Sequence, residues 1–130
     1  MGDDLIKALQ DNKAYQYGEA VNPRHWRDAQ AYAAEVWKIR LPAEYGKLIT
    51  KVNGIRNDVL QLYGIMPVNG FEDLIDRNQD FCGDLVLGAG QDDLLVYCRD
   101  GSYAVIDREN GVVCDVFATL ENALFSWLDL

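Results

Sequence analysis

Apolar residues in the first 40 positions recur three or four residues apart, which is the spacing of an amphipathic α-helix. Residues 3–11 predict a short helix whose apolar face consists of Leu5, Ile6 and Leu9. After a connection over residues 12–23, a longer helix is predicted, with an apolar face made of Trp26, Ala29, Ala33, Val36 and Trp37. We expect this helix to end near Arg40, because Pro42 disfavours a helical conformation at the residue before it.

The middle of the chain predicts two more helices and one strand. Pro42 suits the first turn of a helix that Asn53–Gly54 stops in a left-handed conformation, and its apolar face consists of Tyr45, Leu48, Ile49 and Val52. Residues 58–65 alternate loosely, with β-branched and aromatic members, and predict a strand. A turn over residues 67–70 precedes a short helix over residues 71–79, which buries Phe71, Leu74 and Ile75.

The second half contains hairpin signals between strand-like runs, which cover residues 85–88, 94–98, 102–107 and 112–117. Asp100–Gly101 and Asn110–Gly111 separate the last three runs and favour tight turns, and residues 89–93 suit another reversal. Two-residue turns would place Cys98 opposite Tyr103 and Asp107 opposite Cys114.

Strands clustered in one block, with helices before and after, predict an α+β fold. We expect an antiparallel β-meander of about four to six strands, flanked by N-terminal helices and a C-terminal helix. Thr119 is a suitable N-cap for that last helix, whose apolar face consists of Leu120, Leu124, Trp127 and Leu128. The length of 130 residues predicts a single domain over residues 1–130.

Composition is that of a globular protein, with 49% apolar and 25% charged residues. No apolar run approaches the roughly 20 residues that a membrane-spanning helix needs. The first residues are acidic and polar, where a signal peptide would be basic and then apolar. We therefore expect a cytoplasmic protein.

Few residues are available for catalysis or metal binding. The chain has one histidine, His25, and two serines, so a serine or cysteine hydrolase would have to use that histidine. The three cysteines, Cys82, Cys98 and Cys114, lie at 16-residue spacings that no common zinc motif has. We expect no enzyme activity, no metal and no other cofactor, and we expect free, mostly buried thiols.

Charge is distributed unevenly along the chain. Residues 1–56 carry nine basic and seven acidic residues, a net charge of +2, whereas residues 57–130 carry three and fourteen, a net charge of -11. This acidity repels nucleic acid and anionic membranes and attracts a basic protein partner. An alternative is that the acidity only keeps a small protein soluble.

Five aspartates in the second half are the candidate partner-binding residues. Asp92 and Asp93 come first, because a reversal between two strands would expose them. Asp58, Asp100 and Asp107 come next, and Asp107 has a second interpretation that we favour, as a side chain that orients the following turn.

The segment LPAEYGKLITKVNG, residues 41–54, resembles a motif of the SUKH superfamily, whose founding members are fungal cell-wall assembly regulators. The matching residues are Leu41, Pro42, Tyr45, Leu48, Asn53 and Gly54. Further similarity lies in LYGI at 62–65, strands ending at Gly88 and Asp107, the strand at 111–113, and Phe117. The resemblance covers about residues 35–128 and leaves residues 1–25 as an N-terminal helical extension.

For bacterial members, this resemblance implies an α+β fold and a role as an immunity protein. Such a protein binds a cognate toxin domain, often a nuclease or deaminase, and occludes its substrate site. A general regulatory protein-interaction module, acting in cell-wall or stress physiology, is the alternative.

Overall fold

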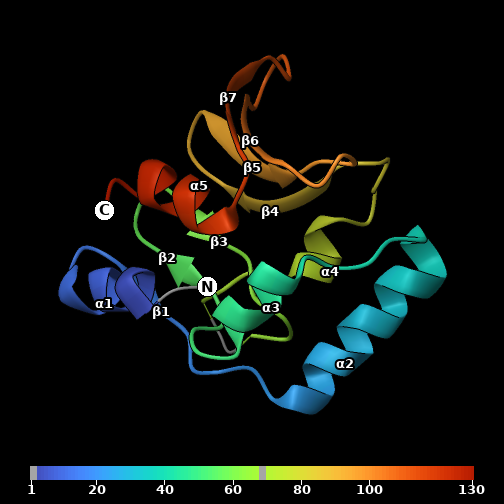
Figure 1. Ribbon diagram of the computed structural model, residues 1–130, viewed down its shortest axis with the longest axis horizontal. Helices are drawn as coiled ribbons and strands as arrows, with labels where there is room; N and C mark the ends of the chain where they lie inside the picture. The colour runs from blue at the N-terminus through green and yellow to red at the C-terminus, as the bar shows by residue number, and fades with distance from the viewer. Residues whose placement is uncertain (1–2, 68–69) are drawn as a thin grey trace.

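The computed structural model describes residues 3–67 and 70–130, and the expected turn at 67–70 lies partly outside them. Seven strands form one antiparallel sheet in which each strand pairs with the next along the chain (Figure 1). In chain order they are β1 (Gln16–Tyr17), β2 (Ile55–Arg56), β3 (Gln61–Leu62), β4 (Leu85–Ala89), β5 (Asp93–Tyr97), β6 (Tyr103–Asp107) and β7 (Val113–Phe117). The α+β meander is confirmed, with seven strands where about four to six were expected.

The helices lie close to their predicted positions. They are α1 (Asp3–Asp11), α2 (Pro23–Tyr32), α3 (Ala43–Ile49), α4 (Leu74–Arg77) and α5 (Leu120–Trp127). A π-helical turn, η1 (Ala33–Trp37), continues α2 and ends at Lys38 in a left-handed conformation. Thr119 caps α5 as predicted, because its hydroxyl accepts a hydrogen bond from the Asn122 amide. Within the described ranges, no helix has the length and apolar character needed to cross a bilayer.

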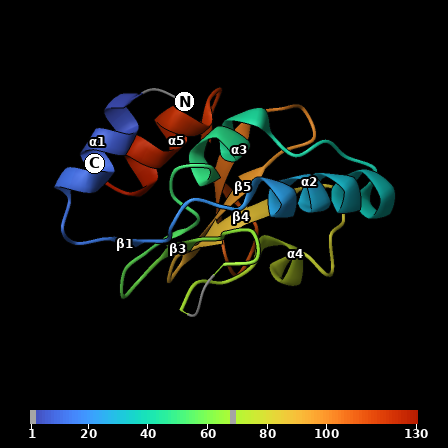
Figure 2. The same ribbon diagram turned by 90° about the horizontal axis from the view of Figure 1, so that it is seen from below.

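The main core lies between the sheet and the helices α1, α3 and α5, which Figure 2 shows together on one side of the sheet. Its fully buried members include Leu9 of α1, Leu48 of α3, Leu95 of β5 and Leu124 of α5. Residues 3–25 are part of this arrangement, because α1 contributes to the core and β1 pairs with β2.

Both hairpin registers differ from the predicted ones. In β5–β6, Tyr97 pairs with Tyr103, because the turn has three residues and Gly101 takes a positive φ of 88°. In β6–β7, the Asp107 amide bonds to the Val112 carbonyl, and a bulge near Cys114 shifts the register again. The predicted pairs Cys98–Tyr103 and Asp107–Cys114 were therefore wrong, since both depended on two-residue turns.

The strand expected over residues 58–65 is reduced to β3, and β1 and β2 were not anticipated. These short strands extend the meander at one edge, where β3 pairs with the end of β4. Beyond β3, the buried Asn78 side chain continues the pairing of β4, since its amide exchanges two hydrogen bonds with the Val86 backbone, each 2.8 Å long. A side chain therefore replaces a neighbouring strand there.

Candidate protein-binding surface

The meander brings three connections together at one end of the sheet. Consecutive turns of an antiparallel meander alternate between its two ends, so the β2–β3, β4–β5 and β6–β7 connections share an end. The contacts agree, because the Arg108 amide bonds to the Asp92 carbonyl and the Arg108 guanidinium to the Gly90 carbonyl, both at 2.9 Å. We call this region, residues 57–60, 90–92 and 108–112, the acidic end.

Four of the five candidate aspartates lie at or beside the acidic end. Asp58 lies in the β2–β3 connection, Asp92 lies in the β4–β5 connection, and Asp93 pairs with Asp107 across neighbouring strands. Asp100 lies in the β5–β6 connection, at the opposite end of the sheet. One partner surface at the acidic end therefore includes four of the aspartates and excludes Asp100.

Two of these four carboxylates serve the fold. The Asp93 carboxylate is half-buried and accepts a 2.9 Å hydrogen bond from the Trp127 indole, which ties β5 to α5. The Asp107 carboxylate accepts hydrogen bonds from the Glu109 and Asn110 amides, at 2.8 and 3.1 Å. Asp107 thus has the turn-orienting role that the sequence favoured, and both side chains are held in place before any partner binds.

The other two carboxylates, Asp58 and Asp92, are exposed, as is Glu109 in the β6–β7 connection. Sequence reasoning missed Glu109, although its place beside the Asn110–Gly111 turn was a usable signal. The described residues form two salt bridges, Lys51–Asp3 and Arg77–Glu72, and neither uses these carboxylates. Their charges are therefore available to a partner.

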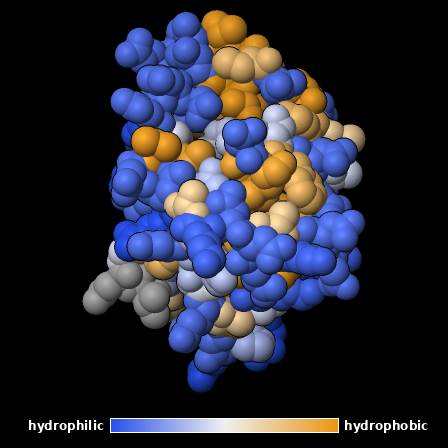
Figure 3. Space-filling model, turned by 90° about the vertical axis from the view of Figure 1, so that its left-hand side faces the viewer, coloured by the Kyte–Doolittle hydropathy of each residue, from blue (hydrophilic) through white to orange (hydrophobic). Residues whose placement is uncertain are grey.

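Exposed apolar side chains adjoin these carboxylates. Val59 and Val112 lie in two of the connections and are 55% and 59% exposed. Val113 and Val116 extend the apolar surface along β7, which pairs only with β6. Figure 3 shows apolar surface, broken by hydrophilic side chains, at the level of the β6–β7 hairpin in Figure 1. Apolar groups within a polar rim are the usual anatomy of a protein interface.

A polar hollow of about 510 Å³ lies between the acidic end and α4. Two arginines line it: the Arg77 guanidinium is ion-paired with the Glu72 carboxylate, and the Arg108 guanidinium donates a hydrogen bond to the Gly90 backbone carbonyl. The hydrogen bond that the Arg77 guanidinium donates to the Glu72 carboxylate raises the pKa of Arg77. Among the described residues, Arg108 forms no salt bridge and keeps its positive charge in the same hollow as Asp58, whereas Arg77 is ion-paired.

All three cysteines are free thiols, but the expectation that they are mostly buried was wrong. Cys82 and Cys114 are exposed, and Cys98 is half-buried, with a pKa raised by that burial. Cys114 is exposed because β7 is an edge strand, and Cys82 because it lies in the connection before β4.

The described residues contain no group of three or more His, Cys, Asp or Glu side chains placed to hold a metal ion. His25 lies half-buried on α2. Comparison of the chain with protein-family models, with curated proteins and with solved structures finds no match.

Proposed function

We propose that this chain is a non-catalytic protein-binding domain, and specifically an immunity protein that neutralises a cognate bacterial toxin domain. The acidic end is the binding surface in this proposal. It occludes the toxin by placing Asp58, Asp92 and Glu109 against basic residues that would otherwise bind the toxin's substrate.

The observation that carries the proposal is the set of exposed carboxylates at the acidic end, which form no ion pair with any described residue and lie beside exposed valines. Three exposed carboxylates on neighbouring connections attract a basic partner, which can supply the ion pairs that they lack among the described residues. The field of such a cluster also steers a basic partner toward it and speeds association. Val59 and Val112 supply apolar area that a partner can bury at the same place.

The resemblance to the SUKH superfamily supports the fold more directly than the binding surface. Its motif residues are largely structural: Tyr45 and Leu48 are fully buried, and the Asn53 amide exchanges hydrogen bonds with the Ile65 backbone. Gly54 has a positive φ of 107°. These residues would build the same fold for many different partners, so the choice of partner rests on the exposed turns.

The test begins with the gene directly upstream, which in this proposal encodes the toxin. Expression of its C-terminal domain should arrest growth, and co-expression of this chain should restore growth. A variant with Asp58→Asn, Asp92→Asn and Glu109→Gln should fold but protect poorly, because it keeps the shape of the surface and loses three charges.

The matched control removes the same charge elsewhere, through Asp28→Asn, Glu35→Gln and Asp84→Asn, which are all exposed positions away from the acidic end. This control should protect like the original chain. Equal loss of protection by both variants would contradict a role for the acidic end. Binding to the upstream product without any protection would instead favour a general regulatory interaction module.

A further inference from the structure

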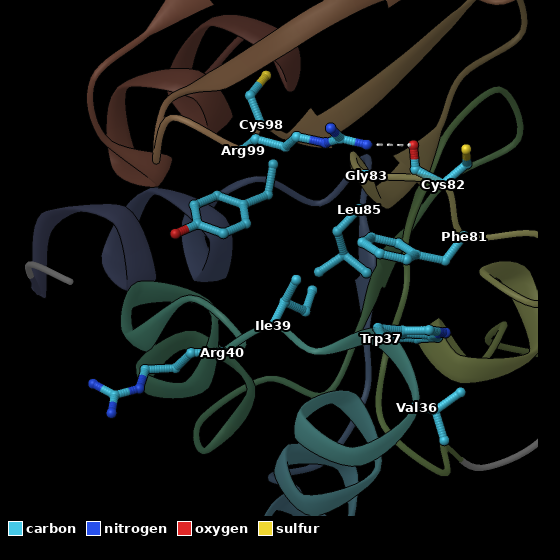
Figure 4. Close-up of a pocket in the computed structure, with 11 residues that line it drawn as sticks. Val36, Trp37, Ile39, Arg40, Phe81, Cys82, Gly83, Leu85, Cys98 and Arg99 are labelled. Carbon is cyan, nitrogen blue, oxygen red and sulfur yellow. Dashed lines mark hydrogen bonds between the residues drawn. The ribbon is translucent and has the colours of Figure 1, made fainter.

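A second concave region lies at the opposite end of the sheet from the acidic end. It has a volume of about 670 Å³, within the range of roughly 300–1,000 Å³ typical of small-molecule sites. Its walls come from η1 and the segment after it, from the connection before β4, and from the end of β5. We call it the arginine pocket, since Arg40 and Arg99 line it (Figure 4).

The apolar wall of the arginine pocket is held in place by aromatic packing. The Trp37 and Phe81 rings stack, with centroids 5.2 Å apart and an interplanar angle of 27°. Tyr32 packs edge-on against Trp37 at 5.4 Å. Figure 4 shows Ile39 and Leu85 beside the Phe81 and Trp37 rings. These groups form a firm surface against which an apolar body can pack.

Arg99 lies across one side of the pocket, and its position is fixed by the backbone. Its guanidinium donates a 3.2 Å hydrogen bond to the Cys82 carbonyl. It also lies against Gly83, where a Cβ atom would overlap it, and Gly83 has a φ of 112°. Among the described residues, Arg99 makes only the hydrogen bond to the Cys82 carbonyl. A guanidinium has five N–H donors, so others remain available to a ligand.

The charge of the pocket is opposite to that of the protein. Two arginines and no acidic residue line the pocket, although the chain as a whole has 21 acidic and 12 basic residues. Figure 4 shows the Arg40 side chain pointing away from the aromatic rings, so the charge at the pocket is that of Arg99. The polar hollow at the acidic end differs, because Asp58 and Glu72 line it beside its two arginines. Asp84 and Asp100 are close enough to influence the Cys98 pKa, but neither lines the arginine pocket.

We propose that the arginine pocket binds a small organic anion with an aromatic or branched apolar body. The Arg99 guanidinium would hold the anionic group, for which a planar carboxylate is the best geometric match, in a two-bonded arrangement. The apolar body would pack against Trp37, Phe81 and Leu85. This site is separate from the acidic end and does not depend on the proposed toxin partner.

The test uses 3-phenylpropionate as the probe and its uncharged amide, 3-phenylpropionamide, as the matched ligand control. Titration into the ¹⁵N-labelled protein should shift the Trp37 indole resonance, assigned with Trp37→Phe, with a dissociation constant of about 1 mM or tighter, as expected for a ligand of this size. The amide should bind at least about tenfold more weakly, because it lacks the charge-assisted contact.

Arg99→Gln should weaken binding of the carboxylate by about tenfold or more. Arg108→Gln is the matched protein control, since Arg108 also bonds to a backbone carbonyl but lies at the acidic end, and it should leave the affinity unchanged. Equal affinity for the acid and the amide, or no effect of Arg99→Gln, would overturn the proposal. So would the absence of a Trp37 shift at about 10 mM probe.

The three thiols provide a second readout. Cys82 and Cys98 line the pocket, whereas Cys114 lies on β7. Alkylation by iodoacetamide, followed at each site by mass spectrometry, should slow at Cys82 and Cys98 when the probe is bound and stay constant at Cys114. Unchanged rates at all three, or equal slowing at all three, would contradict binding in the pocket.

Discussion

The two ends of the sheet differ in their charge, in their shape and in the contacts that stabilise them. At the acidic end, three connections expose Asp58, Asp92 and Glu109 without ion-pair partners among the described residues. At the other end, η1 and the connection before β4 cover the sheet and form a pocket lined by Arg99 and by aromatic rings. One end offers negative charge on projecting turns, and the other offers a concave site beside the positive charge of Arg99.

This difference shows that a net charge counted along the sequence does not describe a surface. Asp93, Asp100 and Asp107 follow one another at similar spacings, yet the meander places Asp100 at the end opposite to the other two. Successive connections of the meander lie at alternate ends of the sheet, so the end at which a turn residue lies depends on how many strands precede it. The acidity of residues 57–130 is therefore divided between two surfaces with different chemistry.

The largest expected effect concerns the end that holds the arginine pocket, where a buried amide replaces a strand. Asn78→Ala should lower the free energy of unfolding by about 2 to 4 kcal/mol, because it leaves the Val86 amide and carbonyl and the Leu74 carbonyl without a partner. Urea unfolding measures this loss. Gln79→Ala, at an exposed neighbouring position, should change stability by less than about 0.5 kcal/mol.

If Asn78→Ala lowers the free energy of unfolding by less than about 1 kcal/mol, this end of the sheet does not depend on the Asn78 amide. That result would contradict the proposed difference in how the two ends are stabilised.

A smaller effect separates two adjacent carboxylates at the acidic end. Asp93→Ala should cost about 1 to 2 kcal/mol, because the half-buried Trp127 indole loses its acceptor. Asp92→Ala should stay within about 0.5 kcal/mol, since this side chain is exposed. Thermal or urea unfolding of both variants provides the comparison. Equal losses at the two positions would show that the acidic end cannot be divided into fold-supporting and partner-facing carboxylates.

The smallest effect concerns Asp100, whose pKa is lowered chiefly by the hydrogen bond from the Ser102 hydroxyl and then by that from the Ser102 amide. A lowered carboxyl pKa stabilises the fold above the unfolded value of about 3.9, and this contribution is lost as the pH falls through the folded pKa. Ser102→Ala should therefore raise the Asp100 pKa toward its usual value. Carboxyl ¹³C titration measures it, and an unchanged pKa would contradict the assignment.

The sequence predicted most elements because their patterns are local. Helix α5 and strands β4 to β7 have clear periodicity and strong turn or capping residues, and they lie where expected. The strands β1 and β2 have two residues each, and their pairing depends on long-range contacts such as the hydrogen bond from the Gly18 amide to the Gly54 carbonyl. No local pattern encodes such a contact.

The candidate surface was partly predictable in the same way. Asp58 and Asp92 lie in exposed connections, as the turn prediction indicated. To know at which end of the sheet each connection lies, however, every strand must be counted, including the two-residue strands. A hairpin register can be predicted only when the length of its loop is known. The β5–β6 loop has three residues, and Gly101 in it has a positive φ. The arginine pocket was not foreseen, because its walls come from segments far apart in sequence.

The most direct test of the central claim is the association rate between this chain and the toxin domain that our proposal places in the gene directly upstream, measured at low and high salt. Salt should slow association by about tenfold or more, because it screens charges beyond about 8–10 Å. At low salt, the Asp58→Asn, Asp92→Asn, Glu109→Gln variant should associate several-fold more slowly with little change in dissociation, whereas the Asp28→Asn, Glu35→Gln, Asp84→Asn control should associate nearly normally. An association rate that ignores both salt and the substitutions at the acidic end would contradict the claim that this end binds the partner.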